Sequence, residues 1–299
     1  MCSTFKYRWC MGRNYDYEQS FNEMIALIPK AESVCCNEYD VIGVCSGLFK
    51  EYPMLYDGMN ENGLCMSGLA FSGNATYLNY NTVKCNVAPY ELIPFVLGNF
   101  ESVNHFIEEV VDGKGLNIID KQFNDRTPNS DLHWFLCDKD KSIVIESTDG
   151  RVSVNENPYN VLTNNPPFWM MEDEIDDLLW KIGISTDYDE DEWTSRGTET
   201  LGLMGDYTSV GRFERLVYLK KHMEKNSLLT PIKDSFKLLN SVEQLYGLTP
   251  VGDKFEYTIY KVVYDMKNLS VNTKKYSEDD FSTLYFNNNF GKDINFVKF

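Results

Sequence analysis

Cys2 directly follows the initiator methionine, and it is the residue of this chain best placed to act as a nucleophile. Its small side chain permits an aminopeptidase to remove Met1, which would leave a thiol and a free α-amine on one residue. Because an α-amine titrates near ~7.7–8.0 and a free thiol near ~8.5, both groups are matched to neutral pH. The amine would then act as the base for the thiol. The alternative is a cysteine that stands at position 2 by coincidence.

Arg13 and Asp16 are two charged residues that could assist Cys2. Residues 3–9 alternate small or polar side chains with aromatic or charged ones, which predicts a strand. A turn directly after this strand would bring the next strand, with Arg13 and Asp16, back towards the N-terminus. A cation near the thiol favours the thiolate, and a carboxylate near the amine would orient it. A surface Arg/Asp pair is the alternative interpretation.

The elements that must position these residues follow from hydrophobic periodicity. Apolar runs flank Asn60-Glu61-Asn62-Gly63, and Asn-Gly is a strong hairpin signal. Further strands are predicted at 41–48, 131–148 and 256–276, and helices at 89–100, 170–183, 211–225 and 232–246. Strands and helices cluster without βαβ alternation, which indicates an α+β fold with antiparallel sheet. The chain shows no clear linker or repeat, so we expect one domain over residues 1–299.

Composition excludes several classes of protein. The net charge of −17 argues against a nucleic-acid or anionic-membrane partner. The first dozen residues do not resemble a secretory signal, so we expect a cytoplasmic protein whose eight cysteines are reduced. The chain has no C-x-x-C, H-E-x-x-H, P-loop or G-x-S-x-G motif, which disfavours metal and nucleotide sites. The acidic run 187–191 lacks the glycine and the final glutamate of a calcium loop, and His133 is expected to be a buried core histidine.

A series of short motifs along nearly the whole chain resembles the choloylglycine hydrolase family, which holds bile salt hydrolases and penicillin V acylases among the N-terminal nucleophile hydrolases. Each motif is weak alone, but together they stand in the family's order: Met1-Cys2, Gly12-Arg13-Asn14-x-Asp16, Tyr56-Asp57-Gly58-Met59-Asn60-Glu61-Asn62-Gly63-Leu64, Leu132-His133-Trp134 with Ser142-Ile143-Val144-Ile145-Glu146, Leu162-Thr163-Asn164-Asn165-Pro166, and Gly205-Asp206-Tyr207-Thr208 with Arg212-Phe213. The resemblance implies a four-layer αββα sandwich with two antiparallel sheets, and hydrolysis of a linear C–N amide without metal or cofactor.

The resemblance also implies a role for each matching residue. Cys2 would be the nucleophile, Arg13 would lie beside its thiol, and Asp16 would bind its amine. Asn164 would donate its side-chain N–H to the oxyanion, with the backbone N–H of Ala70 as the second donor, and Arg212 would join the charge network. Ala70 departs from the Asn or Tyr that members usually carry there, which removes a side-chain contact to substrate but keeps the backbone donor.

Substrate remains open at this level. A glycine- or taurine-conjugated bile salt is the first expectation, with Met11, Met59, Ala70, Phe71 and Phe168 as candidate pocket residues. Penicillin V is the second substrate expected, and an N-acyl homoserine lactone the third. A catalytically silent binding homologue that keeps Met1 is an alternative from another class. The region between Asn164 and Gly205 is shorter than in relatives that form tetramers, so a homotetramer is possible but open.

Overall fold

The structure is a computed structural model of the whole chain, and it describes residues 1–30, 38–49, 52–124, 129–175, 203, 205–286 and 290–299. The acidic run at 187–191 and most of the helix predicted at 170–183 lie outside these residues. Residues 168–175 are helical.

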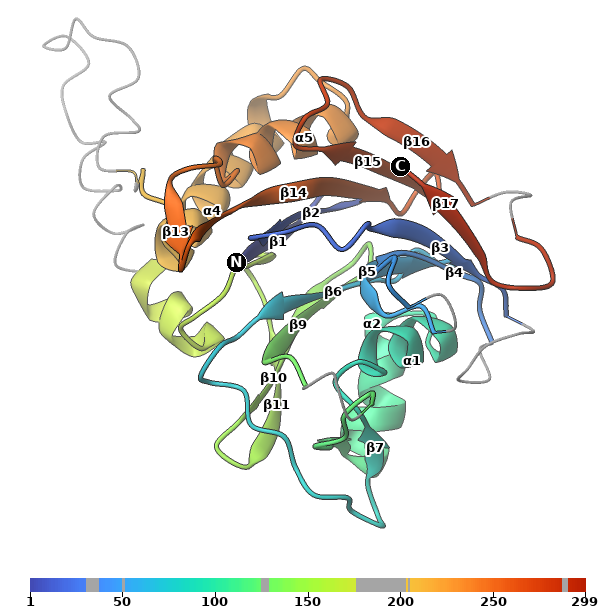
Figure 1. Cartoon of the computed structure of the whole chain (residues 1–299). Coiled ribbons are helices and arrows are strands. Elements are labelled where there is room, and N and C mark those ends of the chain that lie inside the picture. Colours follow the sequence, from blue (N-terminus) through green and yellow to red (C-terminus); the bar gives the residue numbers. More distant parts are fainter. Residues whose placement is uncertain (31–37, 50–51, 125–128, 176–202, 204, 287–289) are drawn as a thin grey trace, which may run out of the picture.

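Two antiparallel sheets form the centre of the molecule (Figure 1). In the described residues the first sheet has the order β12 (Val161–Leu162), β1 (Cys2–Tyr7), β2 (Cys10–Tyr17), β14 (Lys254–Asp265), β15 (Ser270–Lys275) and β16 (Ser282–Tyr285), with β13 (Thr249–Val251) paired to β14. The second has the order β11 (Arg151–Glu156), β10 (Ser142–Thr148), β9 (Leu132–Cys137), β6 (Cys65–Ala70), β5 (Leu55–Asn60), β4 (Val41–Cys45), β3 (Met24–Ile28) and β17 (Asn295–Lys298).

Helices cover the outer face of each sheet. α4 (Ser209–Asn226) and α5 (Pro231–Ser241) pack on the first sheet, and α1 (Leu92–Asn99) packs on the second. Beside α1 lie α2 (Val103–Phe106), the π-helical segment η1 (Ile107–Lys114), and the short parallel pair β7 (Cys85–Val87) and β8 (Leu116–Ile118). The α+β class and the αββα layers expected from the sequence are confirmed.

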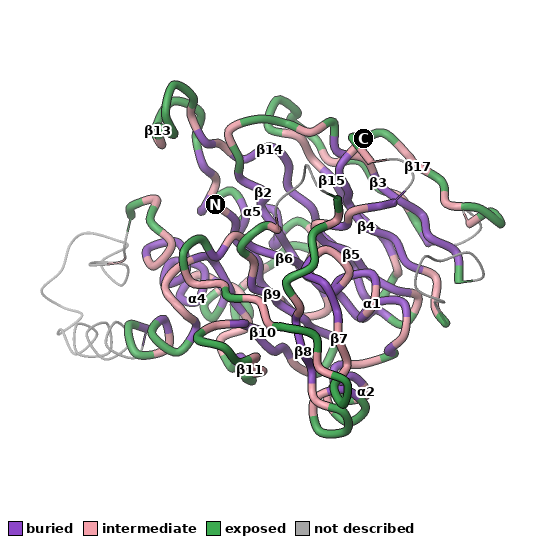
Figure 2. Tube along the Cα trace, turned by 60° about the horizontal axis from the view of Figure 1, so that its bottom comes forward, coloured by how far each residue is buried: buried purple, intermediate pink, exposed green. Residues whose placement is uncertain are grey.

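Strand periodicity divides the buried side chains between two cores. Along β9, Phe135 and Cys137 join the core between the sheets, whereas Trp134 and Leu136 join the core under α1. This is the period-two alternation of a strand that is buried on both faces. Buried residues accordingly run through the central strands, while exposed residues lie mainly in loops, in edge strands and on the outer sides of the helices (Figure 2).

The hairpins predicted at 55–72 and 131–148 form as β5–β6 and β9–β10. In the first of these, Gly63 adopts a φ of 80°, which a side chain would disfavour. The Asn60 side chain accepts hydrogen bonds from the N–H groups of Asn62 and Leu64 and so closes the turn. No helix in the described part of the chain is both long and apolar enough to cross a membrane.

Candidate active site

Cys2 begins β1 and pairs with Tyr15 on β2, and Thr4 pairs with Arg13. Cross-strand partners share a face, so the side chains of Cys2, Arg13 and Tyr15 all point into the space between the two sheets. Asp16, one residue further, points to the opposite face, under α4 and α5. The predicted hairpin therefore does bring Arg13 and Asp16 to Cys2, one from each face of the sheet.

The close packing of this hairpin depends on Gly12. A Cβ atom at Gly12 would lie 2.6 Å from the Cζ atom of Phe5, its cross-strand partner on β1. Real Cβ atoms do not approach other atoms so closely, so a larger residue at position 12 would have to displace the buried Phe5 ring.

Arg13 lies beside the thiol and is fully buried. Its Nη2 donates to the Sγ of Cys2 at 3.5 Å and to the carbonyl of Gly68 at 2.6 Å, while Nη1 forms an ion pair with Asp57. Burial alone would lower the pKa of Arg13, but the nearby Tyr260, Cys2 and Asp57 raise it well above its ordinary value. Arg13 is therefore a permanent cation next to the thiol.

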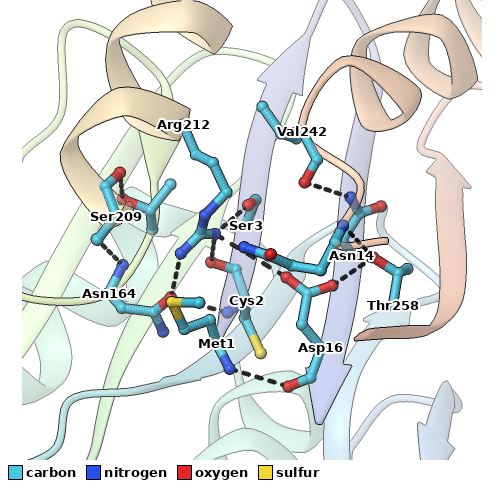
Figure 3. Close-up of polar contacts among 12 residues, drawn as sticks. Met1, Cys2, Ser3, Asn14, Asp16, Asn164, Ser209, Arg212, Val242 and Thr258 are labelled. Atoms are coloured by element: carbon cyan, nitrogen blue, oxygen red, sulfur yellow. Dashed lines mark hydrogen bonds and ion pairs between the residues drawn. The ribbon is translucent and has the colours of Figure 1, made fainter. Parts of the chain in front are cut away.

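Asn164 and Arg212 fix the main chain of Cys2 (Figure 3). The Oδ1 of Asn164 accepts from Cys2 N and from Arg212 Nη2, both at 2.8 Å. Arg212 Nη1 donates to the Cys2 carbonyl at 2.6 Å and to Ser3 Oγ at 2.5 Å. Because α4 supplies Arg212, the helix layer is tied directly to the first residues of β1.

Asp16 is buried between Arg212 and Thr258. Its Oδ1 accepts from Thr258 Oγ1 at 2.6 Å, and its Oδ2 lies 4.0 Å from Arg212 Nη1 and has no hydrogen-bond partner among the described residues. Burial raises the pKa of Asp16, against the lowering effect of Arg212. Burial also lowers the pKa of Arg212.

Met1 extends β1 by one residue. Its carbonyl accepts from Asp16 N and its amine donates to the Asp16 carbonyl, both at 3.0 Å, and the amine forms an ion pair with Glu256. Burial lowers the pKa of this amine below its ordinary value of 8.0. The retained methionine therefore occupies the space directly in front of the Cys2 nitrogen.

Ala70 ends β6 beside Asn164. The N–H of Phe71, directly after β6, donates to the Asp131 carbonyl on the side of β9. Successive residues of a strand direct their N–H and C=O groups to opposite sides. The N–H and C=O of Ala70 therefore point away from β9. Its carbonyl accepts from Asn164 Nδ2 at 2.8 Å, which orients that amide and leaves its second N–H for another acceptor.

A pocket of about 420 Å³ opens above Cys2, Arg13 and Gly68. Its wall includes two pairs of aromatic rings: the Tyr15 ring stacks on the Tyr56 ring with centroids 4.7 Å apart, and the Tyr90 ring meets the Phe123 ring edge-on at 5.4 Å. The other lining residues are Asp16, Tyr17, Met54, Leu55, Ala70, Ser72, Pro89, Ile93, Asn129, Ser130, Asp131 and Leu132.

Of the five pocket residues expected from the sequence, only Ala70 lies in this wall. Met11, Met59, Phe71 and Phe168 are fully buried in the protein interior and are not among the residues that line this pocket. Phe71, for example, stacks on His133 with centroids 4.3 Å apart. Met11, Met59 and Phe168 belong to the packed hydrophobic core, and Phe168 comes from the helix that begins at residue 168, not from a strand.

His133 is a buried core residue, as expected, and it supports the loop that carries Asn164. Its Nε2 contacts the Thr163 carbonyl at 2.9 Å, and its Nδ1 contacts Glu146 at 3.0 Å. The sequence analysis assigned no role to Asp57, Ser209 or Thr258, which contact Arg13, Asn164 and Asp16 respectively. The sequence feature that could have indicated a role for Asp57 is its position as a charged residue within the predicted strand of a hairpin.

Within the described part of the chain, no three side chains of His, Cys, Asp or Glu gather as a candidate metal site. The free thiols of the described part include those of Cys2, Cys10, Cys45, Cys65, Cys85 and Cys137.

Comparison with known proteins agrees with this geometry. The model of the family described as linear amide C-N hydrolases, choloylglycine hydrolase family, matches residues 1–289. Bile salt hydrolase/transferase of Lactiplantibacillus plantarum is 35% identical over 305 residues, which cover 96% of this chain and 93% of that protein. The protein of the same name from Clostridium perfringens is 34% identical over 276 residues, which cover 83% and 80%.

Solved structures agree as well. The mutant C2A conjugated bile acid hydrolase from Clostridium perfringens aligns with a TM-score of 0.88 at 29% identity, covering 100% of this chain and 97% of that chain. Penicillin V acylase from Agrobacterium tumefaciens aligns with a TM-score of 0.71 at 19% identity, covering 95% and 86%, a likeness of fold. The resemblance inferred from the motifs is confirmed.

Proposed function

The chain belongs to the choloylglycine hydrolase family of linear amide C–N hydrolases, and we propose that it cleaves the amide bond of glycine- or taurine-conjugated bile salts with Cys2 as the nucleophile after removal of Met1. The observation that carries the proposal is the position of the Cys2 thiol. It lies at the floor of the pocket, 3.5 Å from a buried arginine, while the Cys2 nitrogen lies 2.8 Å from Asn164 Oδ1.

The chemistry follows from these contacts. Once Met1 is removed, the Cys2 amine takes the proton of the thiol, and the thiolate beside Arg13 attacks the amide carbonyl. The buried Oδ2 of Asp16, which has no hydrogen-bond partner, is available to accept from the resulting ammonium. The proton then passes to the leaving nitrogen, the amine product departs, and water hydrolyses the thioester with the same amine as base.

The oxyanion would receive two donors. The second N–H of Asn164 Nδ2 and the N–H of Ala70 both belong to groups held at the edge of β6, and preorganised donors of this kind act most strongly on the charge that develops in the transition state. Arg212 contributes indirectly, because it fixes the Oδ1 of Asn164 and the carbonyl of Cys2.

The aromatic wall supports a rigid apolar acyl group as substrate. Bile salts stand first because the chain is 35% identical to a bile salt hydrolase/transferase over almost its whole length. Penicillin V, with its phenoxyacetyl group, is the competing substrate, and the stacked Tyr15 and Tyr56 rings would accept an aromatic acyl group as well.

The test is a parallel rate comparison on Met1-free protein. Intact-mass measurement first establishes that the purified chain lacks methionine, and released glycine, taurine or 6-aminopenicillanic acid is then quantified from glycocholate, taurocholate and penicillin V. We expect bile salts to be cleaved with the higher kcat/KM. Higher kcat/KM for penicillin V would reassign the substrate, and a chain that retains Met1 and binds these compounds without cleavage would refute the enzyme.

A further inference from the structure

Behind the nucleophile, a fully buried carboxylate joins the two sheets. Asp57 on β5 accepts from Tyr260 Oη at 2.6 Å and from Tyr264 Oη at 2.5 Å, and it forms the ion pair with Arg13 Nη1. Arg13, Tyr260 and Tyr264 all belong to the first sheet, whereas Asp57 belongs to the second. This cluster is one of the points at which hydrogen bonds join the sheet that carries Cys2 to the sheet that carries Gly68 and Ala70, beside the bond from Ser67 Oγ to Thr4 Oγ1.

Burial keeps the two tyrosine hydroxyls of the cluster protonated. Burial, together with the adjacent Asp57, raises the pKa values of Tyr260 and Tyr264 well above the ordinary value, so both hydroxyls stay protonated and donate. Asp57 thus accepts two neutral hydrogen bonds and one charged one. A buried carboxylate with this complement of donors is satisfied as an anion.

Asp57 restricts where the Arg13 guanidinium can lie. The remaining contacts of that group are the Gly68 carbonyl, the face of the Tyr15 ring at 5.2 Å and the Cys2 thiol itself, and Arg13 Nε has no hydrogen-bond partner. Without Asp57, the guanidinium would be held on one nitrogen only. A displacement of about 1 Å at such a group can cost on the order of 10²-fold in rate.

We infer that Asp57 is a positioning residue of this site: through its contacts with Tyr260 and Tyr264 it holds Arg13 against the Cys2 thiol. The inference rests on the proposed function, in which Arg13 favours the thiolate of Cys2. Asp57 itself touches no reacting atom, because Arg13 lies between it and the thiol.

Two substitutions separate the contacts of Asp57 from its charge. Asp57→Ala removes every contact, so Arg13 is released. Asp57→Asn keeps an oxygen for Arg13 and Tyr260 and places an N–H₂ group where the Tyr264 hydroxyl can accept. The asparagine also removes a negative charge close to the thiol. The positive charge of Arg13 is then less offset at Cys2 and favours the thiolate more strongly.

The measurement is the rate of Cys2 alkylation by iodoacetamide between pH 5 and 9 in Met1-free protein, followed by peptide mass. Only the thiolate reacts, so the rate reports how well Arg13 supports it. For Asp57→Ala we expect about a tenfold slower reaction at pH 7 and a profile displaced to higher pH. For Asp57→Asn we expect a rate equal to or above that of the wild type, and kcat/KM for glycocholate within about tenfold of it.

Matched controls separate positioning from loss of stability. Asp265, at the end of β14 in the first sheet, is also a buried aspartate, but it accepts from the N–H groups of Lys267 and Asn268, whereas Arg13 bonds to Asp57, Cys2 and Gly68. Asp265→Ala and Asp265→Asn should leave Cys2 alkylation within about twofold of the wild type. Alkylation of the half-buried Cys85 provides an internal reference.

Each outcome decides the inference. A folded Asp57→Ala protein that alkylates at the wild-type rate overturns it, and so does an Asp57→Asn protein that is slower than the wild type. If the alanine protein does not fold, the asparagine protein alone still decides. Alkylation needs no substrate, so a wild type that cleaves none of the amides would overturn the proposed function and leave this result standing.

Discussion

The site has two halves that are built differently. Around Cys2, charged and amide side chains from β1, β2, α4 and the segment after β12 are joined by hydrogen bonds of 2.5–2.8 Å. The pocket wall, by contrast, is built around two ring pairs, Tyr15 with Tyr56 at 4.7 Å and Tyr90 with Phe123 at 5.4 Å. Directional bonds fix the first half, whereas the packing of rings shapes much of the second.

This difference indicates which half of the site should tolerate substitutions. A buried hydrogen-bonded network loses much of its function when one partner is removed, because the remaining polar groups are left unsatisfied. An aromatic wall adapts to a new ligand by exchange of ring size and position. Chemistry should therefore depend steeply on residues around Cys2, and substrate choice should depend gradually on the wall.

The largest effect is expected for Cys2→Ala. This change removes the proposed nucleophile and only a sulfur atom, so amide hydrolysis should fall by about 10⁴-fold or more. The folded structure should persist, because the main-chain contacts of residue 2 with Asn164 and Arg212 remain. Turnover of glycocholate and a thermal melt measure the two quantities. Residual activity near the wild-type level would refute the cysteine mechanism.

A smaller loss is expected for Asn164→Ala. It removes the proposed oxyanion donor and the acceptor of Cys2 N, and kcat/KM should fall by about 10²- to 10³-fold. The adjacent Asn165 offers a matched control, since its Nδ2 donates to the Ser72 carbonyl at 2.7 Å and not to Cys2. Asn165→Ala should stay within about threefold of the wild type in the same assay. Equal losses at both positions would argue against a specific role for Asn164.

The pocket wall should respond more weakly. Tyr56→Ala removes one stacked ring, and a loss of apolar contact of this kind should raise KM for glycocholate by about tenfold while kcat changes little. Tyr80, which is 72% exposed, provides a tyrosine outside the pocket, and Tyr80→Ala should leave KM unchanged. A fall in kcat with constant KM would show instead that the wall acts on the chemistry.

The two halves also differ in how far the sequence predicts them. Arg13 and Asp16 are near Cys2 because a hairpin is a local structure with a fixed period, so their approach follows from spacing. The antiparallel sheets and the helices α4 and α5 follow from periodicity in the same way. Asn164 and Arg212 lie far along the chain, and only the order of the motifs indicated them.

The wall could not be inferred from residue type. Met59 and Phe71 are apolar residues in or beside β5 and β6, as a pocket residue would be, yet both face packed cores. Tyr90 and Phe123 lie outside the sheets and reach the pocket only through tertiary packing. Asp57 was visible within a hairpin motif, but its partners Tyr260 and Tyr264 are more than 200 residues away.

The smallest effect that we predict is the effect of the buried Asp16 carboxylate on the stability of the folded protein. Burial raises the pKa of Asp16 above its ordinary value of 3.8. A carboxyl group with a raised pKa in the folded state contributes stability below pH 3.8, and this contribution is lost as the pH rises through the raised value. At neutral pH the ionised Asp16 is therefore expected to destabilise the fold, despite its role in the site.

Asp16→Asn tests this sign. The amide keeps the acceptor for Thr258 and carries no charge at any pH, so the melting temperature at pH 7 should rise by about 2–4 °C. Melts between pH 4 and pH 8 should show this gain shrinking as the pH falls, because the wild-type carboxyl becomes neutral. A lower melting temperature for the variant at pH 7 would mean that attraction to Arg212 outweighs the burial of Asp16. The polar half of the site would then stabilise the fold as well as serve the chemistry.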